Sequence, residues 1–591
     1  MTPFYSKKDL FFQLFEHLGV VELNRYPFFR DHNQETFELI LDAAEQIASK
    51  SLRPLLTEMD RNEPVLENGK IKIHPGMKEI VRQFGEDGWI NATFPYEEGG
   101  QQLPWTIHLA AGFILQAANY SASVFPFLTL GAANLIRTFG NNDLIKRFTP
   151  SMYSGAWQGT MALTEPDAGS SLSDLTTTAY PTSDEGVFRI KGQKIYISCG
   201  DHDACENIIH LMLARIEGAP AGTKGISLFV VPKLIPESGE ANEVFTEGLY
   251  HKMGYKGAPI AHLMIGSENG ALGYLVGEQN QGLRYMFQMM NEARIGVGMN
   301  AVAIAQAAFQ ASLAYAKERP QGRKLSEKDL TKPQVPIIEH ADVKRMLLFQ
   351  KSISEGSLAL LLYCSRLMDE STHESDLVVK KQKHALLELL TPIAKSYPSE
   401  MGILSTSAAV QILGGAGYTQ DFPVEQYYRE ARIHPIHEGT TGIHGLDLLG
   451  RKIFLNDGLG WKVLYQSIEE DLEKYEGPED IRAKFEKAWK EGQNAAATLL
   501  QKAQEGPEIF LADATLFLEL CGIICVGWMW LRQAHIATLN LNKENADTAF
   551  FAGKVETARY FMEYESPKIF AISQRIHSNS YPTLEMRDYW F

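Results

Sequence analysis

A single glutamate, Glu438, stands where its side chain could do chemistry. It precedes Gly439 and Thr440 at the start of a predicted helix. Burial raises the pKa of a carboxylate and makes it a stronger base. Glu438 is therefore a candidate for removing a proton from a weakly acidic C–H group. The simpler alternative is an acid in the first turn of a helix, where acids are favoured.

A second candidate site is the segment MALTEPDAGSSLSD, residues 161–174. Pro166 and Gly169 favour a turn, and Thr164 and Ser170 add hydroxyl groups to it. Such a turn presents backbone N–H groups that suit the ring edge and pyrophosphate of a flavin nucleotide. Taken alone, the segment could equally be an ordinary surface turn.

Two further segments could hold a phosphorylated ligand. In QILGGAGY, residues 411–418, Gly414 and Gly415 allow a ligand to approach the backbone closely, and Gln411 can hydrogen-bond. A helix end followed by a glycine-rich turn is the alternative interpretation. Arg319, in ERPQGR (318–323), carries a permanently charged fork that suits pyrophosphate.

The elements that must position these residues follow the order helices, strands, helices. Apolar residues at helical spacing, short β-branched runs and turn clusters divide the chain into five expected parts. These are an N-terminal extension (1–35), an N-terminal helical domain (36–155, all helical), a central β domain (156–281), a helical bundle domain with Glu438 (282–455) and an additional C-terminal helical domain (456–591).

Individual elements follow from the same patterns. Helices are expected at 77–84, 108–117, 134–139, 283–319, 341–368, 378–396, 401–413, 481–501 and 509–531, and strands at 187–190, 194–198, 208–216 and 226–231. The strands predict a small antiparallel barrel or sandwich.

Composition sets outer limits. The net charge of −16 disfavours a nucleic-acid-binding face. Five cysteines without a metal-type CxxC pair predict reduced thiols. The N-terminus does not read as a signal peptide, and no apolar run reaches the ~18–20 residues of a spanning helix. We expect a cytoplasmic protein with no transmembrane segment.

Together and in this order, LTEPDAGS, ERPQGR, QILGGAGY and HEGTTGI resemble the acyl-CoA dehydrogenase family over roughly residues 36–455. The C-terminal addition resembles the subgroup that includes the 3-methylthiopropanoyl-CoA dehydrogenases and broad-range bacterial fatty acyl-CoA dehydrogenases. The implied fold is α+β multidomain, with a helical domain, a central β-barrel or sandwich, a four-helix-type bundle and an extra helical domain.

The resemblance implies FAD-dependent desaturation of an acyl-CoA thioester to a trans-2-enoyl-CoA. Glu438 would take the α-proton while flavin N5 takes the β-hydride. Hydrogen bonds from a flavin ribityl hydroxyl and the Glu438 backbone N–H would polarise the thioester carbonyl. The electrons would pass to an electron-transferring flavoprotein.

The resemblance also assigns site residues. FAD contacts are implied for Met161, Leu163, Thr164, Gly169, Ser170, Ile197, Ser198, Arg319, Gln411, Gly414, Gly415, Gly439 and Thr440, and substrate contacts for Ser170, Asn291, Arg294 and Gly439. In the family, Arg319 and the QILGGAGY segment reach the FAD of a neighbouring subunit. A homo-oligomer, and most simply a homodimer, is therefore expected.

Several positions depart from the family pattern. Some relatives carry the base on the earlier long helix, but the matching residue here is Ala293, and the adjacent Glu292 points about 100° away. Asn291 stands where Asp is common. His437 replaces a frequent tyrosine, and with His434 it is not spaced as a metal site. Tyr196 takes the place of an aromatic residue beside the flavin.

Two alternatives remain open. An acyl-CoA oxidase would use O₂, and turnover with oxygen alone would identify it. A DNA-associated flavoprotein of the alkylation-response type would need a basic C-terminal domain, whereas residues 469–471 are an acidic run. Salt-dependent DNA retention would favour it. The acyl chain length, and the choice between a fatty acyl-CoA and 3-methylthiopropanoyl-CoA, are also left open.

Overall fold

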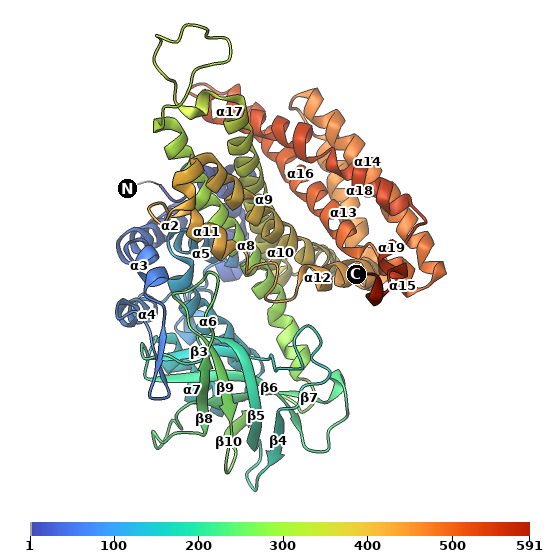
Figure 1. Ribbon diagram of the computed structural model, residues 1–591. Coiled ribbons are helices and arrows are strands. Elements are labelled where there is room, and N and C mark those ends of the chain that lie inside the picture. Colours follow the sequence, from blue (N-terminus) through green and yellow to red (C-terminus); the bar gives the residue numbers. More distant parts are fainter. Residues whose placement is uncertain (1–2) are drawn as a thin grey trace. The chain divides into compact units, whose positions relative to one another are not determined.

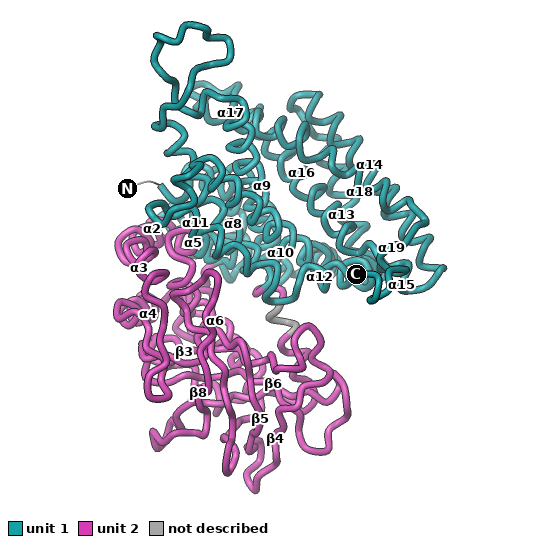
Figure 2. The backbone as a smooth tube through the Cα atoms, viewed as in Figure 1, with its two compact units in different colours: residues 1–39, 104–113, 294–591 teal, residues 40–103, 114–293 magenta. Residues whose placement is uncertain are grey.

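The computed structural model describes residues 3–591, except for the side chains of residues 287–290. The chain divides into two compact units (Figure 2). Unit 1 comprises residues 1–39, 104–113 and 294–591, and unit 2 comprises residues 40–103 and 114–293. Three helices have residues in both units: α2 (Gln34–Ile47), α5 (Trp105–Ala118) and α8 (Gly282–Glu318).

Unit 2 contains a set of helices and the main sheet (Figure 1). Its helices are α3 (Leu56–Arg61), α4 (Gly76–Glu86), α6 (Tyr120–Phe139) and α7 (Asn142–Tyr153). In α4 the buried residues Met77, Ile80, Val81 and Phe84 recur at helical spacing. The helix expected at 134–139 is the last part of the much longer α6, which begins at an Asn119 cap.

The prediction that residues 36–155 are all helical was wrong at one place. Strands β1 (Val65–Glu67) and β2 (Lys70–Lys72) form an antiparallel hairpin. The two residues between them, Asn68 and Gly69, have φ of 50° and 74°. Asn-Gly is a strong signal for a two-residue hairpin turn, so the hairpin was predictable from the sequence.

The main sheet closes on itself. Its strands are β3 (Trp157–Ala162), β4 (Thr178–Pro181), β5 (Val187–Ser198), β6 (Asn207–Ile216), β7 (Ile226–Pro232), β8 (Val244–Leu249), β9 (Ile260–Ile265) and β10 (Ala271–Leu275). The order is β10-β7-β6-β4-β5-β9-β8, and β10 also pairs with β5. Strands β10, β7, β6, β4 and β5 therefore form a closed ring. Most pairings are antiparallel, but β3 and β4 each run parallel to β6.

Strand β5 joins two segments that were predicted separately. Its first half pairs with β4 and β10, and its second half pairs with β9. The change of neighbours comes between Lys191 and Gly192, and a register shift between Lys194 and Ile197 lies inside the pairing with β9. The predicted gap at residues 191–193 contains Gly192, and a glycine inside a strand weakens the strand pattern without ending the strand.

Unit 1 is built on long helices. They are α9 (Ala341–His373), α10 (Leu377–Leu413), α11 (Val424–Ala431) and α12 (Thr441–Gly450), together with most of α8. Helix α9 packs along α10, and only residues 374–376 join them, so the two are antiparallel neighbours. Asp369 of α9 accepts hydrogen bonds from the Trp105 and Thr106 backbone N–H groups, and thereby caps α5.

Helix α10 corrects a second prediction. The expected helices at 378–396 and 401–413 are one continuous helix that contains Pro392 and Pro398. Proline removes a backbone donor and usually kinks or ends a helix. Both prolines are buried here, so packing against neighbouring helices compensates for the lost hydrogen bonds.

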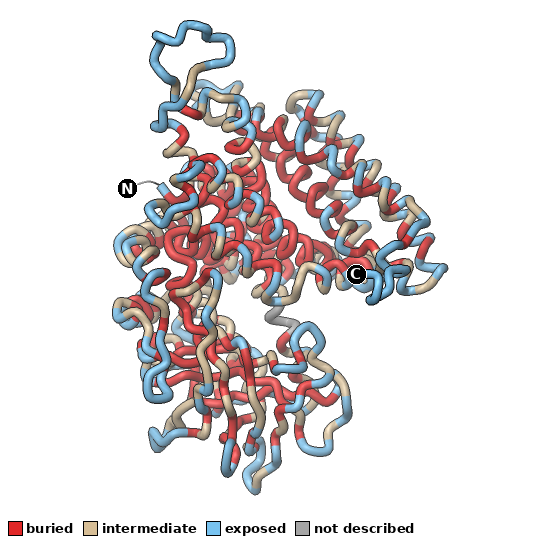
Figure 3. Tube along the Cα trace, viewed as in Figure 1, coloured by how far each residue is buried: buried red, intermediate tan, exposed pale blue. Residues whose placement is uncertain are grey.

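The C-terminal region of unit 1 is helical. It contains α13 (Leu455–Glu473), α14 (Glu479–Lys502), α15 (Pro507–Leu511), α16 (Ala514–Leu541), α17 (Thr548–Tyr560), α18 (Lys568–His577) and α19 (Pro582–Glu585). The helix expected at 509–531 is divided between α15 and α16. Helix α16 contacts α9, α10, α12, α14 and α17 and is buried along most of its length (Figure 3).

Short helical turns connect these elements. They are α1 (Lys7–Phe11), η1 (Phe12–His17), η2 (Val20–Arg25), η3 (Pro27–Phe29), η4 (Ala48–Leu52), η5 (Arg53–Leu55), η6 (Tyr96–Glu98), η7 (Thr223–Gly225), η8 (Ile337–Glu339), η9 (Gly414–Tyr418), η10 (Lys452–Phe454), η11 (Ala503–Glu505), η12 (Phe561–Glu565) and η13 (Asp588–Trp590).

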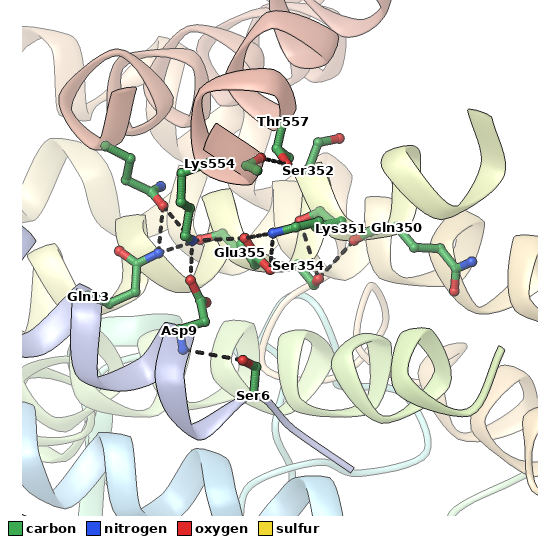
Figure 4. A network of polar contacts seen from close by, with 12 residues as sticks. Ser6, Asp9, Gln13, Gln350, Lys351, Ser352, Ser354, Glu355, Lys554 and Thr557 are labelled. Atoms are coloured by element: carbon green, nitrogen blue, oxygen red, sulfur yellow. Dashed lines mark hydrogen bonds and ion pairs between the residues drawn. The ribbon is translucent and has the colours of Figure 1, made fainter. Parts of the chain in front are cut away.

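A buried ionic cluster joins the two ends of the chain within unit 1 (Figure 4). Lys554 of α17 donates hydrogen bonds to Asp9, to Glu355 Oε2 at 2.8 Å and to Gln533 Oε1 at 3.1 Å. Lys351 also donates to Glu355, at 2.5 Å. Buried charges need such partners, and the cluster fixes the N-terminal segment against α9 and α17.

By length and composition alone, the helices at Tyr120–Phe139, Asn291–Glu318 and Pro507–Leu541 are apolar enough to cross a membrane. More than half of each such apolar stretch is buried in the fold, so packing accounts for the composition. All five cysteines are free thiols, and Cys521 and Cys525 share the buried α16 helix.

Candidate active site

Glu438 lies in the short connection between α11 and α12. Thr440 is the N-cap of α12 and has an extended backbone, so the carboxylate sits just outside the positive end of that helix. Thr441, the first helical residue, donates its hydroxyl to Glu400 Oε1 on α10 at 2.5 Å. The end of the loop is thereby tied to the longest helices of unit 1.

The backbone of this loop is unusual at two successive residues. Glu438 has a φ of 53° and Gly439 a φ of 91°. A non-glycine residue in the left-handed region is strained and often marks a functional site. His444 Nε2 lies 3.0 Å from the Glu438 carbonyl oxygen. Because a carbonyl can only accept, Nε2 carries the hydrogen and supports this conformation.

The Glu438 side chain is exposed at the surface of the described chain. Desolvation by the surrounding protein nevertheless raises its pKa, and the charges of Arg294 and Lys395 oppose this by lowering it. Desolvation prevails, so the pKa stays above that of a free glutamate. A reachable carboxylate with a raised pKa has the properties of a general base.

Arg294, the predicted substrate contact, is buried beside Asp447 of α12. Its Nη1 lies 3.1 Å from Asp447 Oδ2, and Asp447 also accepts a hydrogen bond from Arg451. The Nε of Arg294 has no hydrogen-bond partner among the described residues. An unsatisfied buried donor is costly, so the site leaves one guanidinium N–H available for a further acceptor.

The neighbours of Arg294 on α8 lie in unit 2. Asn291, a predicted substrate contact, and Ala293 are half-buried. Glu292 accepts a hydrogen bond from Asn134 at 3.3 Å, and burial raises its pKa to about 7. The sequence did not single out Glu292 as a titrating group, because an isolated acid on a long helix gives no such signal.

The predicted flavin turn follows β3 in unit 2. Met161 and Leu163 pack against a core cluster that α6 and α7 form with the sheet, and Gly169 and Ser170 are exposed at the tip of the turn. Thr164 is half-buried, and its carbonyl accepts a hydrogen bond from the Ile195 N–H at 2.9 Å. This contact joins the turn to β5.

The same turn is held by a buried ion pair that sequence analysis missed. Lys194 of β5 donates to Glu165 Oε1 at 2.8 Å and to the Leu163 carbonyl at 3.0 Å. Desolvation raises the pKa of Glu165, but Lys194 and hydrogen bonds from Thr177 and Thr176 lower it to about 2. Burial lowers the pKa of Lys194 to about 8, so both groups are charged at neutral pH.

The end of β5 carries the next two predicted flavin contacts. Ile197 is buried and Ser198 is half-buried. Tyr196 lies within the bulge just before them, has a φ of 58° and is 58% exposed. Its ring packs on Tyr250 with centroids 4.6 Å apart. An exposed aromatic pair at a strained position is available to a planar ligand.

A third set of predicted contacts lies at the surface of unit 1. Arg319 follows the end of α8, and Gln411, Gly414 and Gly415 lie at the end of α10; all are exposed. A side-chain Cβ placed on Gly414 or Gly415 would meet nothing within 4 Å. The backbone here is open to a ligand or a second chain.

The residues present fit FAD by their chemistry. Thr164, Ser170 and Ser198 supply hydroxyl groups, the exposed glycines leave space beside the backbone, and Arg319 offers an exposed charged fork for a phosphate. In unit 2 the predicted residues of the turn and of β5 lie on adjoining segments, because Ile195 and Lys194 bond the turn.

The two histidines near Glu438 have no metal-binding geometry. Their ring centroids are 5.4 Å apart, and no group of three or more His, Cys, Asp or Glu side chains among the described residues could hold a metal ion. Burial lowers the pKa of His437 to about 4, so the ring is neutral, and Nδ1 lies 3.0 Å from the Ile433 carbonyl.

Family models match in chain order along nearly the whole sequence. Residues 34–156, 160–267 and 280–453 match the N-terminal, middle and C-terminal domains of acyl-CoA dehydrogenase. Residues 464–587 match a family described as acetyl-CoA dehydrogenase C-terminal like.

Relatives cover most of the chain as well. It is 38% identical to the 3-methylmercaptopropionyl-CoA dehydrogenase of Ruegeria pomeroyi, over 88% of this chain and 88% of the relative. It is 32% identical to the broad-specificity linear acyl-CoA dehydrogenase FadE5 of Mycobacterium tuberculosis, over 98% of each chain.

A solved structure shares the fold. Caenorhabditis elegans ACDH-11, in complex with C11-CoA, superposes with a TM-score of 0.75 over 94% of each chain at 21% identity. The domain matches and the relatives above 30% identity show that the chain belongs to the acyl-CoA dehydrogenase family, whose members are FAD-dependent oxidoreductases acting on CH–CH bonds.

Proposed function

We propose that the protein desaturates an acyl-CoA thioester to a trans-2-enoyl-CoA, with FAD as the cofactor and Glu438 as the α-proton base. The observation that carries this proposal is the Glu438 loop. A reachable carboxylate with a raised pKa is held on a strained backbone between α11 and α12. Family membership supplies the substrate class and the cofactor.

Glu438 accepts the α-proton, and its raised pKa makes that transfer more favourable than it would be for a free glutamate. The Glu438 backbone N–H polarises the thioester carbonyl and stabilises the charge that develops on it. Arg294, with its unused Nε donor, binds the acyl-CoA near this loop. The bound FAD supplies the acceptor for the β-hydride.

The cofactor contacts in this proposal are those that family membership implies. The turn and β5 contribute Met161, Leu163, Thr164, Gly169, Ser170, Ile197 and Ser198. The α12 loop contributes Gly439 and Thr440. Ser170, Asn291 and Gly439 also contact the substrate. Gly169 and Ser170 are exposed, and the hydroxyl-bearing residues Thr164, Ser198 and Thr440 are half-buried, which supports the assignment.

Four residues reach the FAD of a second subunit. They are Arg319, after the end of α8, and Gln411, Gly414 and Gly415, at the end of α10. Their exposure in the single chain supports this part of the proposal, because a residue that serves its own subunit's cofactor would be expected to lie next to the other site residues. The working unit is then a homodimer.

The substrate is a linear acyl-CoA or 3-methylthiopropanoyl-CoA, and the names of the two relatives support these two classes. The electrons pass to an electron-transferring flavoprotein, and the enzyme works in the cytoplasm.

The test is a bleaching assay of the FAD-loaded protein under nitrogen. Linear acyl-CoAs from short to long and 3-methylthiopropanoyl-CoA are added one by one, and the flavin absorbance and the enoyl-CoA product are measured. Bleaching with stoichiometric enoyl-CoA supports the proposal and identifies the chain length. Bound FAD that no thioester bleaches contradicts it. Reoxidation by oxygen as fast as by an electron-transferring flavoprotein would identify an oxidase instead.

A further inference from the structure

Lys395, a fully buried lysine on helix α10, contacts the loop that carries Glu438. Lys395 has no exposed surface, and its Nζ donates hydrogen bonds to the carbonyl oxygens of His434 and Gly439, each at 2.7 Å. Among the described residues it forms no ion pair with a carboxylate. A buried ammonium group is costly unless it is fully hydrogen-bonded, so its two acceptors are essential to the local structure.

The two acceptors lie on either side of the candidate base. His434 precedes Glu438 and Gly439 follows it, so a single side chain holds both arms of the loop. Glu438 and Gly439 have positive φ angles, a conformation that persists only when its surroundings impose it. His444 bonds the Glu438 carbonyl from α12, and Lys395 holds the residues around it from α10.

Lys395 also supplies charge. Burial lowers its pKa to about 8, which leaves the ammonium mostly protonated at neutral pH. Desolvation raises the pKa of Glu438, and the charges of Arg294 and then Lys395 lower it. Of these two cations, Arg294 is already paired with Asp447, whereas the Lys395 charge has no such partner.

The other titratable groups of unit 1 near Lys395 and Glu438 are either neutral or paired with another residue. His444 on α12 is neutral, because burial lowers its pKa to about 3, and burial also lowers the pKa of His434 and His437 in the loop and keeps both rings neutral. Glu400 on α10 bonds Thr441, and Asp447 on α12 bonds Arg294 and Arg451. Removing Lys395 therefore removes one of the two cations that lower the pKa of Glu438 among the described residues.

We propose that Lys395 is a positioning residue for the reaction: it clamps the backbone on both sides of Glu438 and supplies the adjacent positive charge that balances the carboxylate. It touches neither substrate nor cofactor in this proposal and acts through Glu438. The proposal rests on the proposed role of Glu438 as the base.

The test compares Lys395→Met, which removes both the donors and the charge, with Lys395→Gln, which keeps donors but no charge, and Lys395→Arg, which keeps both. A matched control is Lys502→Met. Lys502 is also buried and donates to two carbonyl oxygens, those of Ile576 and Ser578, each at 2.6 Å, but these lie in the C-terminal helical region.

We expect kcat of Lys395→Met to fall about 100-fold, because misplacing a catalytic group by an ångström costs about that much. The acid limb of the pH–kcat/KM profile should move to higher pH in the Met and Gln variants, because the carboxylate loses a favourable charge. Lys395→Arg should keep the wild-type acid limb. Amide hydrogen exchange at residues 434–441 should speed up in Lys395→Met.

Lys502→Met should lower the unfolding midpoint without moving the pH profile. If Lys395→Met behaves like Lys502→Met, with activity falling only as stability falls and an unchanged acid limb, the proposal is overturned. If Lys395→Met does not fold, the Gln and Arg variants decide the question by their acid limbs. Glu438→Gln, assayed in parallel, separates the two claims: residual activity there refutes the base, whereas an inactive Glu438→Gln beside unshifted Lys395 variants refutes only the clamp.

Discussion

Gly439 shows at the scale of a single residue how the backbone limits what the site accepts. Its φ of 91° lies in the region that side chains rarely adopt, and a Cβ there would lie 2.9 Å from His444 Nε2. The His444 ring is buried and bonds the Glu438 carbonyl, so it cannot move aside freely. Glycine is therefore a steric requirement of the loop.

Gly439→Ala should disrupt the loop and lower kcat, because the strain of about 1–3 kcal/mol must be relieved by moving Glu438. The control is Gly442→Ala, the second residue of α12, where an added Cβ meets nothing within 4 Å and the φ is ordinary. Steady-state kinetics and unfolding midpoints of both variants provide the measurement. Equal activity of Gly439→Ala and Gly442→Ala would show that the loop geometry does not matter.

The pH dependence of the reaction follows from the ionisation of Glu438. Glu438 must be ionised to accept a proton, and desolvation raises its pKa above the ordinary glutamate value of 4.5. Activity should therefore be full at high pH and be lost as the pH falls through this raised pKa. A pH–kcat/KM profile measures it. A profile that stays flat to below 4.5, in protein that remains folded, contradicts the assignment.

Candidate site residues could be named from the sequence where they lie in ordered motifs. Residues that act on the site from other segments could not. Glu438, Gly439 and Arg294 stand in recognisable segments. Lys395 lies in the middle of a helical run, and its acceptors are backbone carbonyls about 40 residues away, which no side-chain pattern reveals. A lysine on an otherwise apolar stretch was the available signal, since buried lysines need partners.

At the scale of elements, the turn after β3 and the bulged strand β5 act as one piece. Lys194 is fully buried and Glu165 has 2% of its side chain exposed, and their ion pair lies at the base of the turn that carries Ser170. Strand β5 pairs with β9 on both sides of the bulge between Lys194 and Ile197, so Lys194 and the end of β5 belong to one strand pair. The ion pair therefore fixes the turn relative to Ile197 and Ser198.

Lys194→Met should leave Glu165 charged and unpaired in the interior, which typically costs about 3–5 kcal/mol. The protein should unfold at lower denaturant and bind FAD more weakly. The double variant Glu165→Gln, Lys194→Met should recover part of the loss. FAD titration of the apoprotein and denaturant unfolding are the measurements, and a double variant as weak as Lys194→Met would argue against the pair.

The stabilisation from Glu165 has a defined pH range. Its pKa is lowered to about 2 in the folded protein, so this contribution is present above the ordinary glutamate pKa and is lost as the pH falls toward about 2.

Elements were predictable where periodicity and packing agree. The helix expected from Leu283 onward extends through α8 as a single run, because small and apolar residues continue along it. Periodicity failed at α10, where buried prolines are tolerated, and at β5, where Gly192 interrupts the pattern without ending the strand. In both cases tertiary contacts outweigh a local signal that usually marks a boundary.

At the scale of the whole molecule, the cluster around Lys554 ties the N-terminal segment to the C-terminal helices (Figure 4). Its members come from opposite ends of the sequence, so no local pattern could have predicted it. The domain order, by contrast, followed from composition and the ordered motifs, and the family matches are in the same order.

Lys554→Met should release the N-terminal segment, because it leaves Asp9 and Glu355 buried near each other with one cation fewer, at a cost of about 3–5 kcal/mol. Hydrogen exchange of residues 7–17 should rise more than that of α10. The control is Lys8→Met, which removes a half-exposed pair with Asp547 between the same two regions and should have little effect. Unchanged protection of residues 7–17 in Lys554→Met would show that the cluster does not hold the segment.

The most direct test of the central claim is the anaerobic half-reaction of FAD-loaded Glu438→Gln beside wild type, with the best acyl-CoA from the substrate panel. Glutamine keeps the size of the side chain and cannot accept the α-proton. The account predicts wild-type bleaching with enoyl-CoA formation and, in the variant, retained FAD and bound thioester without bleaching. Bleaching of Glu438→Gln at a rate near that of wild type would contradict it, because the base would then be another residue.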